Sequence, residues 1–283
     1  MCMDGDVWEL YNHTRRATGC LPIGVILTIA ASGSEMSDSS VITKEEGGIK
    51  RGYNDDICRP KFAIMNPELT MTLPDYQTAC GCTDILMHTM ERYFVQGDAM
   101  EITDSIAEAL MRTVIKQAKI LRDNPKNYDA RAEVMWAGSL SHNGLTGCGS
   151  KDNDFATHLM EHEVGGMFDV AHGAGLAALW GSWARYVYRE CLPRFHAFAV
   201  NVMDVADEGA PEEVALRGIE AMETFYRAIG MPTSFAELGL RPTEEQLMTM
   251  ARQCSVASGG KKGSAKVLYE KDMLAIYRMA AAR

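Results

Sequence analysis

The chain has 283 residues, of which 47% are hydrophobic and 23% charged, a balance typical of a globular protein with a substantial core. A formal net charge of −10 argues against nucleic acid or an anionic membrane as partner, because both are bound through clustered lysine and arginine. No stretch approaches the roughly 20 apolar residues of a membrane span, and the N-terminus lacks the apolar run of a signal peptide, so we expect a cytoplasmic protein.

The first part of the chain is predicted to be extended. Three short apolar runs, separated by segments rich in glycine, serine and charge, predict strands at residues 23–29, 40–43 and 62–65. No helical pattern lies between these runs, and no glycine-rich turn joins a strand to a helix. The three strands therefore do not make up a complete doubly wound sheet for binding a dinucleotide.

After Pro67 the pattern becomes helical. The segment Thr72-Leu-Pro74-Asp75 indicates a helix start, with Thr72 as the cap and Pro74 in the first turn. Apolar residues recur at helical spacing over 102–121, and Asn124-Pro125 ends that run. Further helices are predicted near 128–145, 154–167, 173–190, 211–229, 243–256 and 270–282, with a break at Gly165-Gly166 among others. The sequence thus predicts a mainly α protein with a β-rich start.

Asp84 and His88 form the first group of candidate ligands. They stand four residues apart, so on a helix both side chains project from one face, which Glu91 shares. A carboxylate and an imidazole placed in this way can chelate one divalent ion. The alternative is a simple hydrogen-bonded pair in the core.

Three histidines form the second group. His158, His162 and His172 fall within fifteen residues of sequence. His158 and His162 lie on one predicted helical face, the glycine pair lets the chain turn, and His172 begins the next helix. Histidines that cap and pair inside a helical bundle are the alternative, but the two groups together favour a metal. One carboxylate with imidazoles and no thiolate suits Fe²⁺, Zn²⁺ or Mn²⁺.

The order of these ligands resembles that of a known family. Asp-x-x-x-His, followed by His-x-x-x-His and a third His-Gly, is similar to the iron-containing (group III) alcohol dehydrogenases. Residues 22–35, 66–74, 127–137 and 229–232 resemble the butanol-dehydrogenase and aldehyde-reductase branch of that family. The resemblance implies that His162 lines the substrate side as the catalytic residue. It also implies a metal ion, with Fe²⁺ expected ahead of Zn²⁺, and four ligands: Asp84, His88, His158 and His172.

The same resemblance implies that NAD(P)H binds in the cleft between two domains. Thr28 and Ser37 then lie near the phosphates and ribose, and Lys50 lies at the nicotinamide ribose. Ser32 and Leu69 are further candidates for contact with the cofactor. For the serine and threonine residues the alternative is a plain turn, which these residue types favour on their own account.

Relatives in this family begin with a domain that carries a Gly-Gly-Gly-Ser turn for the pyrophosphate, and the match here begins near Asp6. We therefore expect a truncated dehydroquinate-synthase-like fold. Residues 1–66 would be a remnant of the α/β dinucleotide-binding domain, and residues 67–283 an all-helical metal-binding catalytic domain. Such a chain is expected to bind metal and to hold the dinucleotide weakly, and the sequence leaves open whether it is active alone.

The implied function is hydride transfer between NAD(P)H and a primary alcohol or aldehyde, by a homo-oligomeric metal-dependent dehydrogenase. A glycerol-dehydrogenase-like relative and a dehydroquinate-synthase-like lyase are alternatives within the superfamily. A metal-dependent hydrolase would instead activate water and turn over without nucleotide. A non-catalytic helical module would use the ion as a structural staple and lose stability on chelation.

Overall fold

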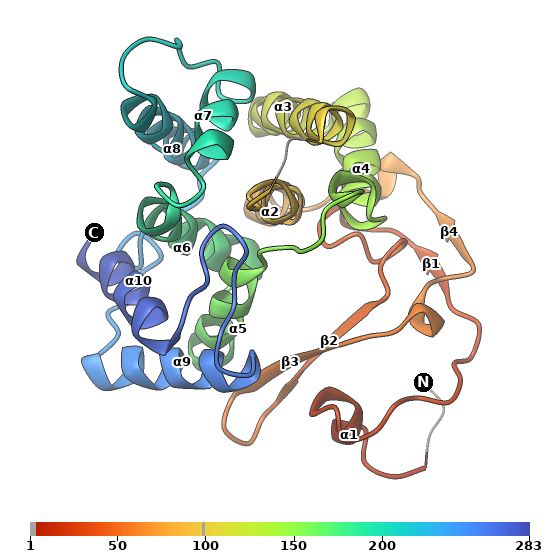
Figure 1. Cartoon of the computed structure of the whole chain (residues 1–283). Coiled ribbons are helices and arrows are strands. Elements are labelled where there is room, and N and C mark those ends of the chain that lie inside the picture. The colour runs from red at the N-terminus through yellow and green to blue at the C-terminus, as the bar shows by residue number, and fades with distance from the viewer. Residues whose placement is uncertain (1–3, 98–99) are drawn as a thin grey trace.

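The computed structural model describes residues 4–97 and 100–283 and has two parts (Figure 1). The head, residues 4–70, holds the short helix α1 (Trp8–Tyr11), four strands and two 3-10 turns. The body comprises residues 71–97 and 100–283; its described regular structure is helical apart from an isolated bridge between Lys262 and Leu268. The expectation of a mainly helical protein is confirmed. The division into domains at residues 66 and 67 stays a prediction.

The strands of the head form two separate pairs. β1 (Gly24–Ile26) runs parallel to β4 (Phe62–Ile64). Between them in sequence, β2 (Ser39–Lys44) and β3 (Ile49–Asn54) form an antiparallel hairpin. The sequence predicted three of these strands and missed β3, because Lys50 and Arg51 interrupt the apolar pattern that identifies a strand. The 3-10 turns η1 (Asp56–Cys58) and η2 (Pro67–Thr70) precede and follow β4.

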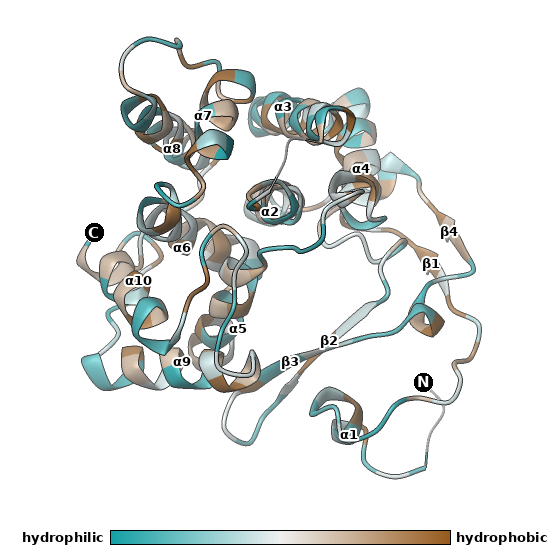
Figure 2. Cartoon of the chain, viewed as in Figure 1, coloured by the Kyte–Doolittle hydropathy of each residue, from teal (hydrophilic) through white to brown (hydrophobic). Residues whose placement is uncertain are grey.

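The parallel pair keeps several apolar side chains at the surface. Ile26, Phe62 and Ile64 are 61%, 63% and 50% exposed, and Figure 2 shows β1 and β4 coloured as hydrophobic. The ring of Phe62 lies over Gly24, where a Cβ atom would stand only 2.3 Å from it. The pair buries little apolar surface of its own, so its backbone hydrogen bonds carry much of its stability.

The body is built around α2 (Asp75–Tyr93) and α6 (His172–Val187), which are buried over most of their length. Figure 1 shows α2 end-on between α6, α3 (Glu101–Asp123) and α4 (Tyr128–His142), all three of which contact it. The other helical elements are η3 (Leu145–Gly147), α5 (Ala156–Phe168), α7 (Leu192–Asn201), α8 (Pro211–Ala228), α9 (Glu244–Ala257) and α10 (Glu270–Ala282). No helix within the described ranges has the length and apolar character needed to cross a membrane.

Three local predictions in the body were wrong. Thr72 does not cap α2, whose N-cap position is Pro74 without a side-chain hydrogen bond. The glycine pair at 165–166 does not turn the chain, because α5 continues through it and Asp169 makes the turn with φ of 51°. Helix α7 lies between the helices predicted near 173–190 and 211–229 and was not predicted, although its Pro193 stands in the first turn, where proline is well accommodated.

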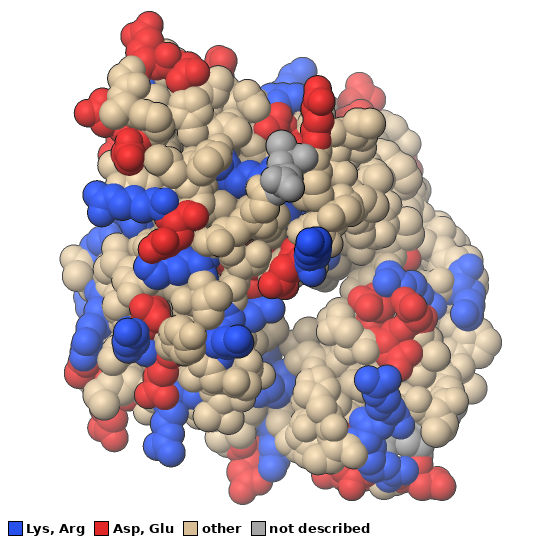
Figure 3. All heavy atoms as spheres, viewed as in Figure 1, with Lys and Arg blue, Asp and Glu red and all other residues tan. Residues whose placement is uncertain are grey.

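The head docks onto the body at two places where glycine permits close approach. A Cβ atom on Gly166 of α5 would stand 2.2 Å from the carbonyl oxygen of Gly48, in the β2–β3 turn. A Cβ atom on Gly81 of α2 would stand 2.2 Å from the carbonyl oxygen of Ala30. Backbone contacts this close leave no room for a side chain. Between the two parts, Figure 3 shows a gap on the viewed face.

Candidate metal centre

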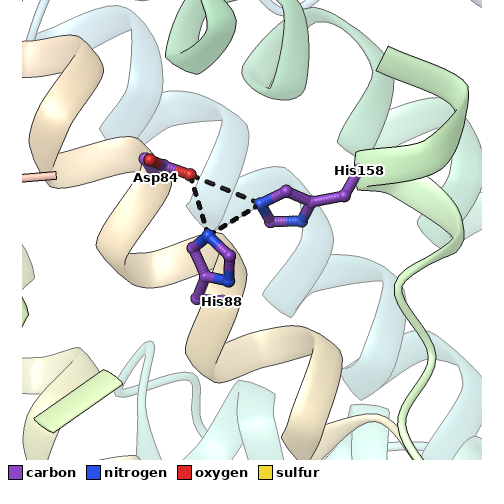
Figure 4. Close-up of side chains that lie close together, drawn as sticks. All are labelled: Asp84, His88 and His158. Carbon is purple, nitrogen blue, oxygen red and sulfur yellow. Dashed lines mark hydrogen bonds and ion pairs between the residues drawn. The ribbon is translucent and has the colours of Figure 1, made fainter. Parts of the chain in front are cut away.

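Three histidine side chains lie around one carboxylate oxygen of Asp84, and the four residues come from three helices. Helix α2 supplies Asp84 and His88 one turn apart, α5 supplies His158, and His172 is the first residue of α6. Three of the four are drawn in Figure 4. Asp84 Oδ1 lies 3.3 Å from the Nε2 atom of His158, 3.4 Å from that of His88 and 3.7 Å from that of His172. The two groups of residues singled out in the sequence therefore form one cluster.

The spacing of these atoms fits a single ion. The Nε2 atoms of His88 and His158 are 3.1 Å apart, and ligand atoms of Asp84, His88 and His158 all lie within 4.8 Å of one another. His172 joins this group through Asp84 Oδ1 at 3.7 Å, and also lies within 4.8 Å of ligand atoms on Glu161 and His162. Four ligands in a tetrahedron at about 2.1 Å from a cation stand about 3.4 Å from one another. One carboxylate with three imidazoles is a donor set that Fe²⁺, Zn²⁺ and Mn²⁺ accept. Asp84, His88 and His158 can therefore hold one divalent ion, and His172 stands next to them as the fourth candidate ligand.

Glu91 holds His158 in place. The Nδ1 atom of His158 is hydrogen-bonded to Glu91 Oε2, and the backbone amide of His158 donates to Glu91 Oε1 at 3.1 Å. Burial opposes a charge on His158, but the two carboxylates Glu91 and Asp84 outweigh it and raise the pKa of His158 to about 10. Burial likewise raises the pKa of Asp84, but the hydrogen bond from His158 and the nearby histidines outweigh it and lower that pKa. The cluster therefore favours positive charge at its centre.

Within the described ranges, His88 has no carboxylate partner on Nδ1 like Glu91. It packs instead against His142, a residue that the sequence analysis did not identify. The Nδ1 atom of His88 is buried without a hydrogen-bond partner among the described residues. The ring of His142, the last residue of α4, lies against it with centroids 3.7 Å apart. Burial lowers the pKa of His88 well below its usual value and that of His142 to about 3, so both rings are neutral near neutral pH. His142 has no characteristic spacing to the other histidines, so no sequence pattern identified it.

His162, the expected catalytic histidine, lies beside this cluster. Its ring centroid is 5.8 Å from that of His172. Burial, followed by electrostatic interactions with neighbours such as His172 and Lys50, lowers the pKa of His162 well below its usual value. One ring nitrogen of His162 also lies within 4.8 Å of ligand atoms on His172 and Glu161. His162 is thus a neutral imidazole at the edge of the centre.

The five residues expected to contact a nucleotide lie in the head, in different settings. Thr28 and Ser32 are exposed in the segment after β1, and Leu69 is 40% exposed in η2. Ser37 is buried, and its hydroxyl oxygen accepts a hydrogen bond from the Ser39 amide at 2.9 Å. The amino group of Lys50 lies 3.7 Å from a carboxylate oxygen of Glu161. That carboxylate also contacts the Nδ1 atom of His172.

Comparison with known proteins finds similarity over nearly the whole chain. Residues 78–281 match the model of the Fe-containing alcohol dehydrogenase family, C-terminal, and residues 1–67 match that of iron-containing alcohol dehydrogenase. NADH-dependent butanol dehydrogenase A of Clostridium acetobutylicum is 38% identical over 276 residues, which are 97% of this chain and 70% of that protein. The NADPH-dependent aldehyde reductase YqhD of Escherichia coli is 33% identical over 240 residues, or 83% of this chain and 60% of that protein. The crystal structure of NADH-dependent butanol dehydrogenase A from Thermotoga maritima gives a TM-score of 0.93 at 34% identity, covering 99% of this chain and 71% of that one.

Proposed function

Because this chain belongs to the iron-containing alcohol dehydrogenase family, we propose that it transfers a hydride between NAD(P)H and a primary alcohol or aldehyde. The observation that carries the proposal is the convergence of one carboxylate and three imidazoles on a single point. We assign the ion, Fe²⁺ ahead of Zn²⁺, to four ligands: Asp84, His88, His158 and His172. When bound, such an ion supplies Lewis acidity, which stabilises negative charge on a substrate oxygen.

The protein's own part is to hold these ligands and to exclude water. Asp84 and His158 are only 3% and 6% exposed, so electrostatic interactions in the centre are stronger than they would be at the surface. Glu91 supports His158 through its Nδ1 atom and its backbone amide. A ligand set fixed before substrate binds needs little reorganisation during the reaction.

We assign the proton relay to His162. A neutral imidazole can accept a proton at one ring nitrogen and release one from the other, and His162 is neutral because burial lowers its pKa. It stands next to His172 without being one of the three histidines that lie near Asp84 Oδ1. This position suits a group that exchanges a proton with the substrate oxygen.

We assign the cofactor to the side of the centre that the head covers. Lys50 would contact the nicotinamide ribose, because its amino group lies beside Glu161, which contacts His172 of the cluster. Thr28, Ser32, Ser37 and Leu69 are proposed as contacts to the rest of the nucleotide. The named relatives include an NADH-dependent and an NADPH-dependent enzyme, so both cofactors belong in the test.

We also propose a dehydroquinate-synthase-like fold, a homo-oligomeric assembly and a cytoplasmic location. The fold proposal is supported by the arrangement of a head with strands against a helical body. The formal net charge of −10 supports a small-molecule substrate rather than nucleic acid or a membrane surface as partner. Light scattering after size-exclusion chromatography measures the assembly.

The test uses the full chain stripped of metal and reloaded with Fe²⁺ or Zn²⁺. We expect weak binding of NADH or NADPH in a fluorescence titration, as the sequence predicts, and metal-dependent oxidation of the bound nucleotide with butanal. Hydrolysis of esters or phosphates without nucleotide would instead identify a metal-dependent hydrolase. If chelation lowers the thermal stability and the chain shows neither turnover nor nucleotide binding, the metal has a structural role only.

A further inference from the structure

Glu161 of α5 is a fully buried carboxylate with a partner on each side. Its side chain is 0% exposed. Oε2 contacts the Nδ1 atom of His172 in the body and lies 3.7 Å from the Nζ atom of Lys50 in the head. A buried carboxylate is costly unless its charge is compensated. Glu161 therefore depends on both partners.

The space around Glu161 is shaped by two glycines. A Cβ atom on Gly165 would stand 2.9 Å from Glu161 Oε1, and one on Gly175 would stand 2.7 Å from it. That oxygen has no hydrogen-bond partner within the described part of the chain. Oε1 is confined between two backbones, so Oε2 is left to face His172 and Lys50. The carboxylate has little freedom to turn away.

We propose that Glu161 is a positioning residue, which fixes His172 as a metal ligand and uses Lys50 of the head as its counter-ion. With Nδ1–H directed at Glu161, the lone pair on Nε2 of His172 faces Asp84 Oδ1, 3.7 Å away. A carboxylate on the far nitrogen of a ligating imidazole sets its tautomer, holds its orientation and makes it more basic. This inference rests on the proposed function, because it requires that the cluster binds an ion.

The inference also joins the metal centre to the docking of the head. Lys50 lies in β3, so the charge that compensates Glu161 arrives only when the hairpin is packed against α5. A neighbouring pair provides a matched control. Arg51 of the same strand lies 2.9 Å from Glu163 of the same helix, and Glu163 is equally buried. Removing Glu163 disturbs the same interface through a carboxylate that contacts an arginine rather than a histidine.

The experiment measures Zn²⁺ and Co²⁺ affinity by calorimetry on metal-free full-length protein, without nucleotide or substrate. We expect Glu161→Ala to lower the affinity by about 10- to 100-fold, as removal of such partners does at other metal sites. Glu161→Gln should lower it less, because the amide oxygen still accepts a hydrogen bond from Nδ1. The control Glu163→Gln should leave it unchanged. The visible absorption of bound Co²⁺ should shift in Glu161→Ala alone, because only there does an imidazole change orientation.

The outcomes separate this inference from the function on which it rests. If the unchanged chain binds neither ion, the proposed metal function is overturned. If it binds them and Glu161→Ala binds equally well, or if Glu163→Gln weakens binding as much, only the positioning role is overturned. Circular dichroism checks folding, and if Glu161→Ala does not fold, the comparison of Glu161→Gln with Glu163→Gln decides. If Glu161→Gln binds the metal more weakly than Glu163→Gln, the proposal is supported. If the two variants bind the metal with equal affinity, the proposal is overturned.

Discussion

Asp84 Oδ1 and His158 Nε2 stand 3.3 Å apart, although their residues are separated by 74 positions in the chain. The contact is made because α2 is buried in the body and α5 packs against it. Asp84 is buried in that interface. A buried carboxylate is stable in its charged form only where a positive charge compensates it. The fold therefore maintains a site that attracts a cation.

Asp84→Asn should abolish most of the metal affinity. The substitution removes the one anionic ligand. We expect the metal affinity to fall by at least about 100-fold, which is more than the loss on removing a residue that only supports a ligand. Calorimetric titration with Zn²⁺ measures it. Asp207→Asn is the control, since Asp207 forms a 2.8 Å pair with the partly exposed His196 away from the centre. Wild-type affinity in Asp84→Asn would contradict the assignment of the ligands.

Arg51→Met should destabilise the protein strongly. Glu163 is almost fully buried and would keep a charge without its partner, which costs about 3–5 kcal/mol. Urea unfolding measures the change in free energy. The double variant Arg51→Met with Glu163→Leu should regain most of the loss, because it leaves no unpaired charge. A double variant as unstable as the single one would show that the pair acts through packing rather than charge.

Gly166→Ala should loosen the head from the body. The added methyl would stand 2.2 Å from the Gly48 carbonyl oxygen, so the hairpin must move, at a cost of about 1–3 kcal/mol. Gly138→Ala is the control, because its methyl meets Ile85 at an ordinary 3.5 Å. That change should be neutral or stabilising within α4, by up to about 1 kcal/mol. Equal unfolding midpoints for the two variants would rule out the close contact.

Asp272→Asn should lower stability at neutral pH but not in acid. Burial opposes ionisation of Asp272, but hydrogen bonds from the Tyr186 hydroxyl and the Tyr269 amide outweigh it and lower its pKa. A pKa below the unfolded value contributes stability that is present above about pH 4 and is lost as pH falls through the folded value. Wild type and variant should differ by about 1–2 kcal/mol at pH 7 and converge below pH 4.

Urea unfolding at a series of pH values measures this convergence. Glu270→Gln serves as the control, since Glu270 is exposed in the same first turn of α10. Its effect should be small at every pH. A gap between wild type and Asp272→Asn that stays constant down to pH 3 would show that the side chain contributes through shape rather than charge.

Local periodicity accounts for what the sequence predicted well. Asp84 and His88 share a face because the helical repeat alone places them there, and the body's helices follow from the spacing of their apolar residues. Two residues that support the cluster, Glu161 and His142, were not predicted. Glu161, between His158 and His162 in sequence, has the appearance of an ordinary charged helix residue. His142 likewise acquires its place only when α4 packs against α2.

The parallel pairing of β1 with β4 has a consequence for how the head folds. Gly24 meets Phe62 only after the whole intervening chain has closed into a loop, whereas Lys44 meets Ile49 across a short turn. Closing the longer loop costs more entropy and is slower. We expect the hairpin to nucleate first and draw the ends of that loop together. The parallel pair, with few apolar contacts of its own, should then be the first part of the head to open to hydrogen exchange.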